Sequence, residues 1–223
     1  MRKYYSLVKN EREADLMIYG TMTSMPWLES DVSGFSITRE LAELDADTIN
    51  VYINSYGGET AVGLAIYNAL KAHPAKIRTI CDGFACSAAS LVFMAGDERI
   101  MNAASLLMIH NAWISAEGDA KELRKQADDL ETISVVASEA YRAAVNITDE
   151  QLAKLLDNET WIPPKDALSM GFATSIVHEQ TDQINQSVQN AVFMNLTAKP
   201  LPEMKQTIST FLSALSQRGK ETR

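Results

Sequence analysis

Apolar and polar residues alternate along the first half of the chain with two different periodicities, one typical of helices and one typical of strands. Residues 60–72 carry apolar side chains at the three- and four-residue spacing of a helix face, and the apolar segment 88–95 predicts a second helix closed by Gly96. Segments of β-branched and apolar residues that are typical of strands lie at 16–20, 48–53, 76–81, 98–101 and 105–110. Strands that alternate with helices at this spacing predict an α/β fold with βαβ crossovers and a largely parallel sheet.

Shorter elements are predicted on both sides of this core. They are a helix over 36–44 capped by Ser36 or Thr38, a helix over 150–156 opened by the capping-box spacing of Thr148 and Gln151, a short helix from Pro163 and Pro164 to Gly171, and a last strand over 172–178. No internal repeat is found beyond the strand–helix cycle itself.

The longest predicted element covers residues 119–146. Apolar side chains recur at 123, 127, 130, 133, 137, 141 and 144 without an intervening Gly or Pro, and charged residues fill the other faces. The pattern predicts one amphipathic helix of about 40 Å at 1.5 Å per residue. A helix longer than its own domain is wide favours a contact between copies in an oligomer. The alternative is a helix packed along its whole length on its own sheet.

Composition indicates a globular protein with one domain, alone or with an appendage. The 223 residues are 46% hydrophobic and 22% charged. A net charge of −9 and a pI near 4.9 argue against a nucleic-acid partner, because phosphate neutralisation needs clustered Lys and Arg. No apolar segment approaches the roughly 20 residues that span a bilayer, and the polar start of the chain lacks the apolar core of a signal peptide. We therefore expect a cytoplasmic protein without a membrane partner.

Cysteines and histidines are few and scattered. Cys81 and Cys86 lie five residues apart in a predicted strand and turn, where buried free thiols are the common case. His73, His110 and His178 form no ligand cluster, so neither a metal site nor a cofactor is expected.

The composition changes after residue 178. Gln, Asn, Ser and Thr dominate first, and the weakly amphipathic segment TISTFLSALS follows AKPLPEM. The sequence therefore predicts a domain over 1–178, and a polar linker with a tail helix over 179–223.

Candidate chemistry lies at two glycine-bearing turns, NSYGG and DGFACS, each predicted between a strand and a helix. The carboxyl ends of parallel strands share one crevice, so Gly57, Gly58 and Ser87 should lie within reach of one another. Neither turn has the G-x-G-x-x-G of a dinucleotide site or the Gly-Lys-Ser/Thr of a phosphate loop. A hydroxyl at a helix N-terminus remains, where free peptide N–H groups favour developing negative charge.

Ser87 has two interpretations at this position. It can cap the helix, as serine often does, or it can act as a nucleophile if a base lies nearby. Among the three histidines, only His110 ends an apolar strand where its ring would reach the same crevice. A strand-end histidine can also be purely structural. Serine, histidine and glycine amides from separate strand ends make a constellation for nucleophilic catalysis.

Four ordered segments then resemble a known family. YINSYGGETAVGLAIYNAL, TICDGFACSAASLVFMAGDERIM, SLLMIHNAW and DNETWIPPKDALSMGFATSI are similar to the ClpP-like serine proteases of the ClpP/crotonase superfamily. The likeness is closer to the phage and prophage head maturation proteases, on the segments YGTM, DVSG and ETW and on the two alanines after Ser87. The resemblance covers roughly 15–177. It implies repeated ββα units, a largely parallel sheet and a long protruding handle helix over about 119–146.

The resemblance also implies roles for individual residues. Ser87 would be the nucleophile and His110 the general base, with the backbone N–H groups of Gly58 and Ala88 as the oxyanion hole. The triad acid would be Glu159, which matches the family position without a gap, or Asp157 if the loop bends. Tyr56 departs from the family pattern, which commonly has proline there.

The implied function is a serine endopeptidase that assembles into a ring or stacked rings and cleaves scaffold or capsid protein in a phage procapsid. In that setting the protein would be found in the host cytoplasm or the procapsid. One alternative is a cellular ATP-dependent Clp proteolytic subunit that is fed by an AAA+ unfoldase. A second is a crotonase-like acyl-CoA enzyme, and a third is a ring protein with a dead site.

Overall fold

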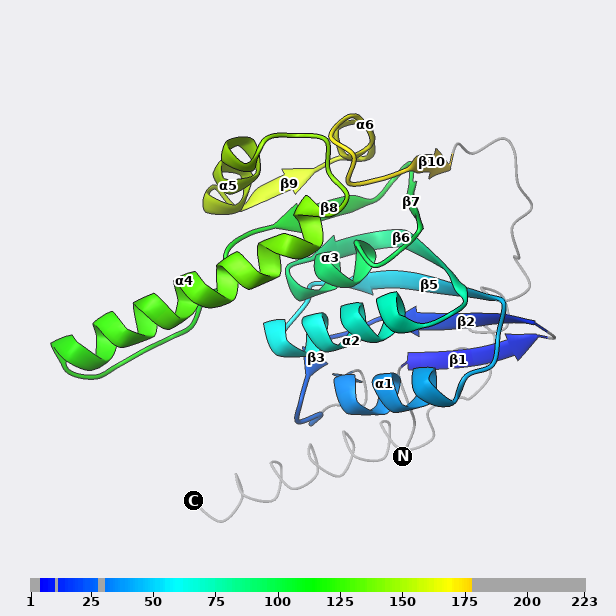
Figure 1. Ribbon diagram of the computed structural model, residues 1–223, viewed down its shortest axis with the longest axis horizontal. Helices are drawn as coiled ribbons and strands as arrows, with labels where there is room; N and C mark the ends of the chain where they lie inside the picture. The colour runs from blue at the N-terminus through cyan, green and yellow to red at the C-terminus, as the bar shows by residue number, and fades with distance from the viewer. Residues whose placement is uncertain (1–4, 11, 28–30, 178–223) are drawn as a thin grey trace, which may run out of the picture. The chain divides into compact units, whose positions relative to one another are not determined.

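The computed structural model describes residues 5–10, 12–27 and 31–177 as an α/β fold (Figure 1). The strands are β1 (Tyr5–Asn10), β2 (Glu13–Ile18), β3 (Met22–Thr23), β4 (Val32–Ser33), β5 (Thr48–Ser55), β6 (Lys76–Cys86), β7 (Glu98–Asn102), β8 (Leu106–Ile109), β9 (Thr160–Ile162) and β10 (Ser175–Val177). The helices are α1 (Gly34–Glu43), α2 (Thr60–Ala72), α3 (Ala88–Phe93), α4 (Ala120–Arg142), α5 (Asp149–Asp157) and α6 (Pro164–Ser169).

The central sheet is mostly parallel, as the sequence predicts. Its order is β1-β2-β5-β6-β7-β10, and β8 and β9 continue it from the far end of β6. Two pairs are antiparallel, β1 with β2 and β8 with β9, and the other pairs of this sheet are parallel. The sequence analysis did not predict β1 or β9. The polar composition of β1 and the three-residue length of β9 give little periodic signal.

Strand β6 is longer than predicted, and the interpretation of DGFACS as a turn is wrong. Residues 78–81 pair with β7, and residues 84–86 pair with β8. The strand therefore changes neighbour at Asp82 and Gly83 without ending. This switch carries the chain to Cys86 and brings Ser87 next to the end of β8.

Helices α1, α2 and α3 lie along one face of the sheet (Figure 1). On β5, Ile49, Val51 and Ile53 are fully buried and alternate with residues of the opposite face. Every residue of α3 is buried, which is why its sequence reads as apolar on all sides. Full burial of each large aliphatic side chain contributes about 1.5–3 kcal/mol, so this layer holds α3 firmly in place.

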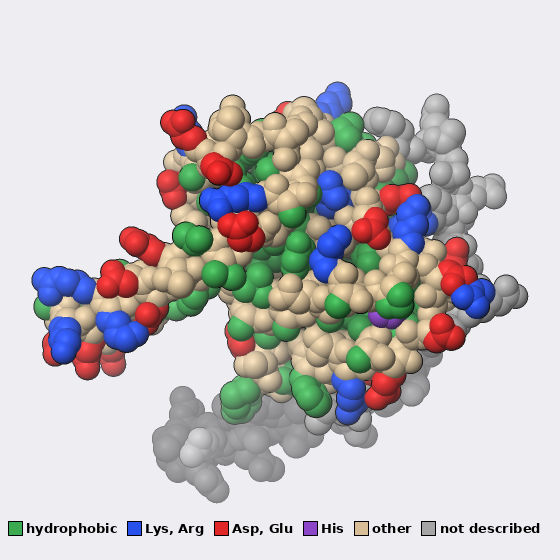
Figure 2. Space-filling view, viewed as in Figure 1, with side chains coloured by type: hydrophobic (Ala, Val, Ile, Leu, Met, Phe, Trp, Pro, Cys, Tyr) green, Lys and Arg blue, Asp and Glu red, His purple; other side chains and the backbone are tan. Residues whose placement is uncertain are grey.

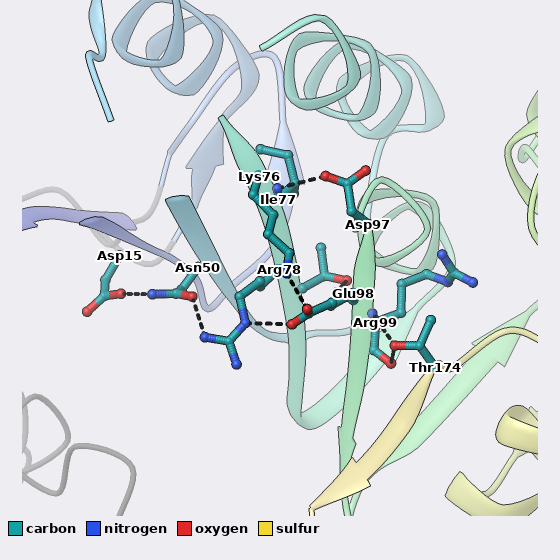
Figure 3. A network of polar contacts seen from close by, with 10 residues as sticks. Asp15, Asn50, Lys76, Ile77, Arg78, Asp97, Glu98, Arg99 and Thr174 are labelled. Atoms are coloured by element: carbon teal, nitrogen blue, oxygen red, sulfur yellow. Dashed lines mark hydrogen bonds and ion pairs between the residues drawn. The ribbon is translucent and has the colours of Figure 1, made fainter. Parts of the chain in front are cut away.

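The other face of the sheet carries a polar ladder across four strands (Figure 3). Asn50 on β5 donates to Asp15 on β2 at 2.8 Å and accepts from Arg78 on β6 at 3.3 Å. Arg78 also donates to Glu98 on β7 at 2.9 Å, and Lys76 pairs with the same carboxylate. Asp15, Asn50, Arg78 and Glu98 stand opposite one another in register across the four strands, so the ladder supports the pairing that the apolar face requires.

Capping hydrogen bonds mark the starts of two helices, one as predicted and one not. The capping box predicted at Thr148 and Gln151 is confirmed, because both reciprocal hydrogen bonds are present. The first helix, however, is α1 from Gly34, and its cap is Ser33, whose side chain accepts from the Ser36 N–H at 3.4 Å. Ser36 and Thr38 lie inside the helix, so their prediction as caps is wrong.

Helix α4 leaves the body of the domain (Figure 1). It begins after Asp119, which closes a capping box with Glu122, and it ends at Arg142, four residues before the predicted end. Only Ser138, Ala140 and Tyr141 are buried, so the helix does not pack along its whole length on its own sheet. Acidic and basic side chains gather on its protruding end (Figure 2).

The chain divides into two compact units, Met1–Glu179 and Gln180–Arg223. The predicted linker and tail helix over 179–223 lie outside the described residues, so the domain boundary at 178 stays a prediction. In the described part, no helix is both long and apolar enough to cross a membrane.

Candidate active site

Ser87 stands at the junction of β6 and α3 with a backbone that serine rarely adopts. Its φ of 53° and ψ of −126° lie outside the regions that L-residues favour, a strain of about 1–3 kcal/mol. Its N–H donates to the Met108 carbonyl at 2.9 Å and so extends the β6–β8 ladder by one step. The hydroxyl makes no capping bond to the helix. The capping interpretation therefore does not account for this side chain.

His110 follows β8 directly and meets that hydroxyl. The pairing of Cys86 with Met108 places the two chain ends side by side. The distance from His110 Nε2 to Ser87 Oγ is 2.7 Å, the length of a good hydrogen bond. The imidazole is largely buried, with 13% of its side chain exposed, so its orientation is constrained. The structure thus brings together the two residues that the sequence analysis selected.

The two candidate acids lie in different environments. Strand β9 pairs Thr160 with Ile109, so Glu159 stands beside His110, and its Oε2 is 3.9 Å from His110 Nδ1. Asp157 ends α5 and accepts a 2.7 Å hydrogen bond from the Asn111 amide. Glu159 therefore faces the ring, while Asp157 is engaged elsewhere. The Glu159 side chain is 62% exposed and can approach the ring by rotation.

The glycine pair after β5 is held against Ser87 by the short strand β3. The Met22 N–H donates to the Gly57 carbonyl at 2.8 Å, and the Met22 carbonyl accepts from the Glu59 N–H at 2.9 Å. In this parallel bridge, Gly57 and Glu59 turn their groups toward Met22, so the Gly58 N–H points to the opposite side, toward the cleft. A Cβ on Gly57 would lie 2.8 Å from Ser87 Cβ, so only glycine fits there.

Ala88 is the first residue of α3, and the N–H of a first helical residue has no partner within its helix. Gly57 approaches it closely, because a Cβ on that glycine would lie 2.9 Å from the Ala88 nitrogen. The expectation that the glycine turn and Ser87 lie within reach of one another is therefore confirmed. Gly58, Ser87 and Ala88 all line the same cleft.

These groups line an open cleft of about 720 Å³. Its walls come from the glycine turn, the start of α3, the residues after β8 and the buried end of α4. Its apolar lining residues include Leu91, Met108, Ala137 and Leu156. The cleft is large enough for a peptide with an apolar side chain next to the Ser87 hydroxyl.

A model of the Clp protease family matches residues 31–180, which is 150 of the 223 residues. The match includes Ser87, His110, Glu159 and the glycine pair. The chain belongs to the Clp protease family. This membership agrees with the mixed α/β fold and the mostly parallel sheet, and it confirms the predicted fold class and the enzyme class, a ClpP-type serine peptidase.

Curated relatives of the Clp protease family carry a more specific name. The "ATP-dependent Clp protease proteolytic subunit" of Deinococcus radiodurans is 30% identical over 150 residues, 65% of this chain and 74% of the relative. The subunit of the same name from Borrelia garinii subsp. bavariensis is 28% identical over 154 residues, 66% and 79% of the two chains. The "ATP-dependent Clp protease proteolytic subunit 3" of Rhodococcus jostii is 32% identical over 131 residues, 58% and 65% of the two chains.

The other histidines and the two cysteines were also considered in the sequence analysis, and those that the structure describes have the environments of structural residues. His73 accepts from the Ala75 N–H at 3.1 Å through Nδ1, so its Nε2 carries the proton and donates to the Leu44 carbonyl at 3.0 Å. Cys81 and Cys86 are buried free thiols, as predicted, and burial raises the pKa of Cys81 to about 12 and of Cys86 to about 11. His178 lies outside the described residues. Among the residues described, no group of three or more His, Cys, Asp or Glu could hold a metal ion.

Sequence reasoning missed two parts of this site. Met22 holds the glycine pair through its backbone alone, and a two-residue strand leaves no periodic signal. Ser90 and Tyr141 lie behind Ser87, where Ser90 appears only as one residue of an apolar helix and Tyr141 as one member of the long amphipathic stripe. Contacts between residues 51 positions apart cannot be inferred from either pattern.

Proposed function

We propose that this member of the Clp protease family is a serine endopeptidase in which Ser87 is the nucleophile and His110 the general base. The observation that carries the proposal is the 2.7 Å contact between His110 Nε2 and the Ser87 hydroxyl, which performs no capping role. A buried imidazole at hydrogen-bond distance from a strained serine is what activation of a weak hydroxyl nucleophile requires.

The chemistry follows from the positions of the groups. His110 Nε2 takes the hydroxyl proton while Ser87 Oγ attacks the scissile carbonyl carbon. The carbonyl oxygen becomes an oxyanion between the N–H groups of Gly58 and Ala88, and each such donor contributes about 3–4 kcal/mol to the barrier reduction. His110 then gives its proton to the leaving amine, and water hydrolyses the acyl-enzyme by the same route in reverse.

Glu159 is our proposal for the third member of the triad. It is the carboxylate that faces His110 Nδ1, at 3.9 Å, and a rotation of its exposed side chain would shorten this distance to that of a hydrogen bond. There it would hold the ring in the tautomer that leaves Nε2 free to accept and would stabilise the imidazolium. Asp157 is the weaker candidate, because its carboxylate accepts from the Asn111 amide.

The test is covalent labelling with a fluorescent fluorophosphonate, followed by peptide mapping. We expect label on Ser87 in the wild type and none in Ser87→Ala, with peptide hydrolysis lowered about 10⁵- to 10⁶-fold. Ser90→Ala is no suitable control, since Ser90 contacts the site, but Ser105→Ala removes a serine hydroxyl outside the cleft lining. Wild-type protein that resists the probe in every assembly state would refute the proposal, and a crotonase-like enzyme or a dead ring protein would then be favoured.

Two alternative classes of protein substrate are proposed. The motif likeness to head maturation proteases favours scaffold or capsid protein of a phage procapsid, whereas the names of the curated relatives favour unfolded chains delivered by an ATPase. Incubation with scaffold protein and with casein, each with and without an AAA+ partner and ATP, separates the two. Casein cleavage that requires the partner and ATP supports the cellular type. Scaffold cleavage without either supports the phage role, with the residues from 179 onward as a candidate docking or self-cleaved segment.

We also propose that the protein assembles through α4. Ile133, Val135 and Val136 are 41–57% exposed on this helix, although apolar side chains normally seek burial. Burial between copies in a ring or in stacked rings would cover them. Val135→Glu and Val136→Glu should lower the mass measured by light scattering, and an unchanged mass would contradict this assignment.

A further inference from the structure

A chain of buried hydrogen bonds runs from helix α4 to the Ser87 carbonyl. The Ser90 hydroxyl donates to the Ser87 carbonyl oxygen at 2.6 Å, and the Tyr141 hydroxyl lies 2.7 Å from Ser90 Oγ. Serine has a single hydroxyl proton, which is already committed, so the Tyr141 hydroxyl is the donor in the second bond. The direction of the chain is therefore fixed, from Tyr141 through Ser90 to Ser87.

Packing alone does not explain the Tyr141 hydroxyl. The residue is only 2% exposed and Ser90 is fully buried, so two hydroxyl groups are removed from water. Burial raises the pKa of Tyr141 and keeps it neutral. Its ring stacks edge-on against Phe172 with the centroids 6.1 Å apart, and a phenylalanine would make the same stack. Burial of a hydroxyl is unfavourable without a partner, and the partner here is the serine behind the nucleophile.

The Ser87 carbonyl belongs to the same planar peptide as the Ala88 N–H. Because the peptide is rigid, fixing the carbonyl direction also fixes the N–H, which points the opposite way. Ser87 is strained and would gain about 1–3 kcal/mol by relaxing. The Ser90 hydroxyl and the Ser90 N–H, at 2.9 Å, both hold this carbonyl in place. The hydroxyl bond is the one of the two that is anchored to another helix.

We propose that Ser90 and Tyr141 are positioning residues that aim the Ala88 N–H at the oxyanion. The inference rests on the proposed function and adds to it a role for the buried end of α4. Because the Ala88 N–H binds the oxyanion more strongly than the ground-state carbonyl, loss of alignment lowers kcat and leaves KM nearly unchanged. Complete loss of such a donor costs about 10²- to 10³-fold, so misalignment should cost about 5- to 30-fold.

The test compares Tyr141→Phe and Ser90→Ala with a matched control, Thr79→Val. Thr79 is also fully buried and donates at 2.7 Å to a carbonyl of α3, that of Phe93, but at the end of the helix away from Ser87. The measurements are melting temperature, the second-order rate of fluorophosphonate labelling, its pH midpoint, and kcat and KM for a fluorogenic peptide amide. The phosphonyl oxygen of the probe occupies the oxyanion position, so the labelling rate reports the hole directly.

We expect Tyr141→Phe and Ser90→Ala to label about 5- to 30-fold more slowly, with the pH midpoint and KM unchanged. Thr79→Val should lose comparable thermal stability and label at the wild-type rate. Equal labelling of Tyr141→Phe and Thr79→Val would overturn the inference, as would a shifted pH midpoint, which would place the effect on His110. If Ser90→Ala does not fold, Tyr141→Phe decides alone. Wild-type protein without label would refute the proposed function, and the positioning role with it.

Discussion

Gly63 offers a sharp test, because it does not line the cleft and yet packs against Ala88, whose N–H is a proposed oxyanion-hole donor. A Cβ at this position would lie 2.7 Å from the Ala88 carbonyl oxygen and 3.0 Å from Ala88 Cβ. Ordinary contact begins at 3.4 Å, so Gly63→Ala forces α2 and α3 apart by about 0.7 Å at this point. Overpacking of this kind costs about 1–3 kcal/mol. The better helix propensity of alanine returns about 1 kcal/mol.

The net loss in unfolding free energy is therefore about 0–2 kcal/mol, or up to about 8 °C in melting temperature. The effect on labelling should be larger than this loss of stability indicates. A displacement approaching 1 Å at a catalytic group can cost about 10²-fold, so we expect fluorophosphonate labelling of Gly63→Ala to slow by about 10- to 100-fold. The two quantities are separable, because a fully folded sample can be labelled well below its melting temperature.

Gly34→Ala is the matched control. Its new methyl group would lie 2.9 Å from Val62 Cγ1, the end of a side chain, and it would not reach Ala88. This variant should lose a similar amount of stability and label at the wild-type rate. If Gly63→Ala is destabilised and still labels as fast as the wild type, the reasoning that ties the α2–α3 contact to Ala88 is refuted.

Three further predictions concern single side chains. Glu159→Gln should lower kcat about 10-fold or more while Asp157→Asn leaves it within about 2-fold, and the reverse order in a kinetic assay would make Asp157 the triad acid. At pH 8 the raised pKa values of Cys81 and Cys86 leave at most about 0.1% of each thiol as thiolate. Iodoacetamide should therefore alkylate the folded protein at least about 100-fold more slowly than the denatured protein, and rapid alkylation of the folded protein in mass spectrometry would contradict this burial. Burial raises the pKa of Asp82, which accepts hydrogen bonds from Tyr19 and Asn102, so the folded state binds the Asp82 proton more tightly than the unfolded state does. The unfolding free energy should therefore rise as pH falls through the folded pKa toward the unfolded value of about 3.9. Urea titrations of Asp82→Asn should lack this contribution, and parallel pH dependences for the two proteins would disprove it.

Periodicity in the chain was sufficient for most of the fold. Helix α2 was predicted with the bounds that the structure has, because a clear apolar stripe ends before His73 and Pro74. The capping box at Thr148 was equally readable, since both of its partners lie within four residues. One prediction failed because the deciding contact was remote. The continuation of β6 through Gly83 depends on its pairing with β8, in which Phe84 faces Leu106, and without that partner Gly83 resembles a turn residue.

The candidate site also has parts that the sequence predicts and parts that need the structure. Ser87 and His110 could be selected from strand-end positions and confirmed as neighbours, because parallel strands bring their carboxyl ends to one edge. The proposal of Glu159 rather than Asp157 as the triad acid rests on the register of β9 on β8, which places Glu159 beside His110, whereas Asp157 accepts from Asn111.

Local pattern in the chain was enough to specify the helices, the central strands and the residues that offer nucleophilic chemistry, because these depend on neighbours within a few positions. Long-range pairing alone determined the strain at Ser87, the hydrogen bonds of Met22 to the glycine turn and the hydrogen bonds that link Tyr141 through Ser90 to Ser87. The physical reason is that a peptide group can be aimed at a point in space only by partners that approach it from other parts of the chain.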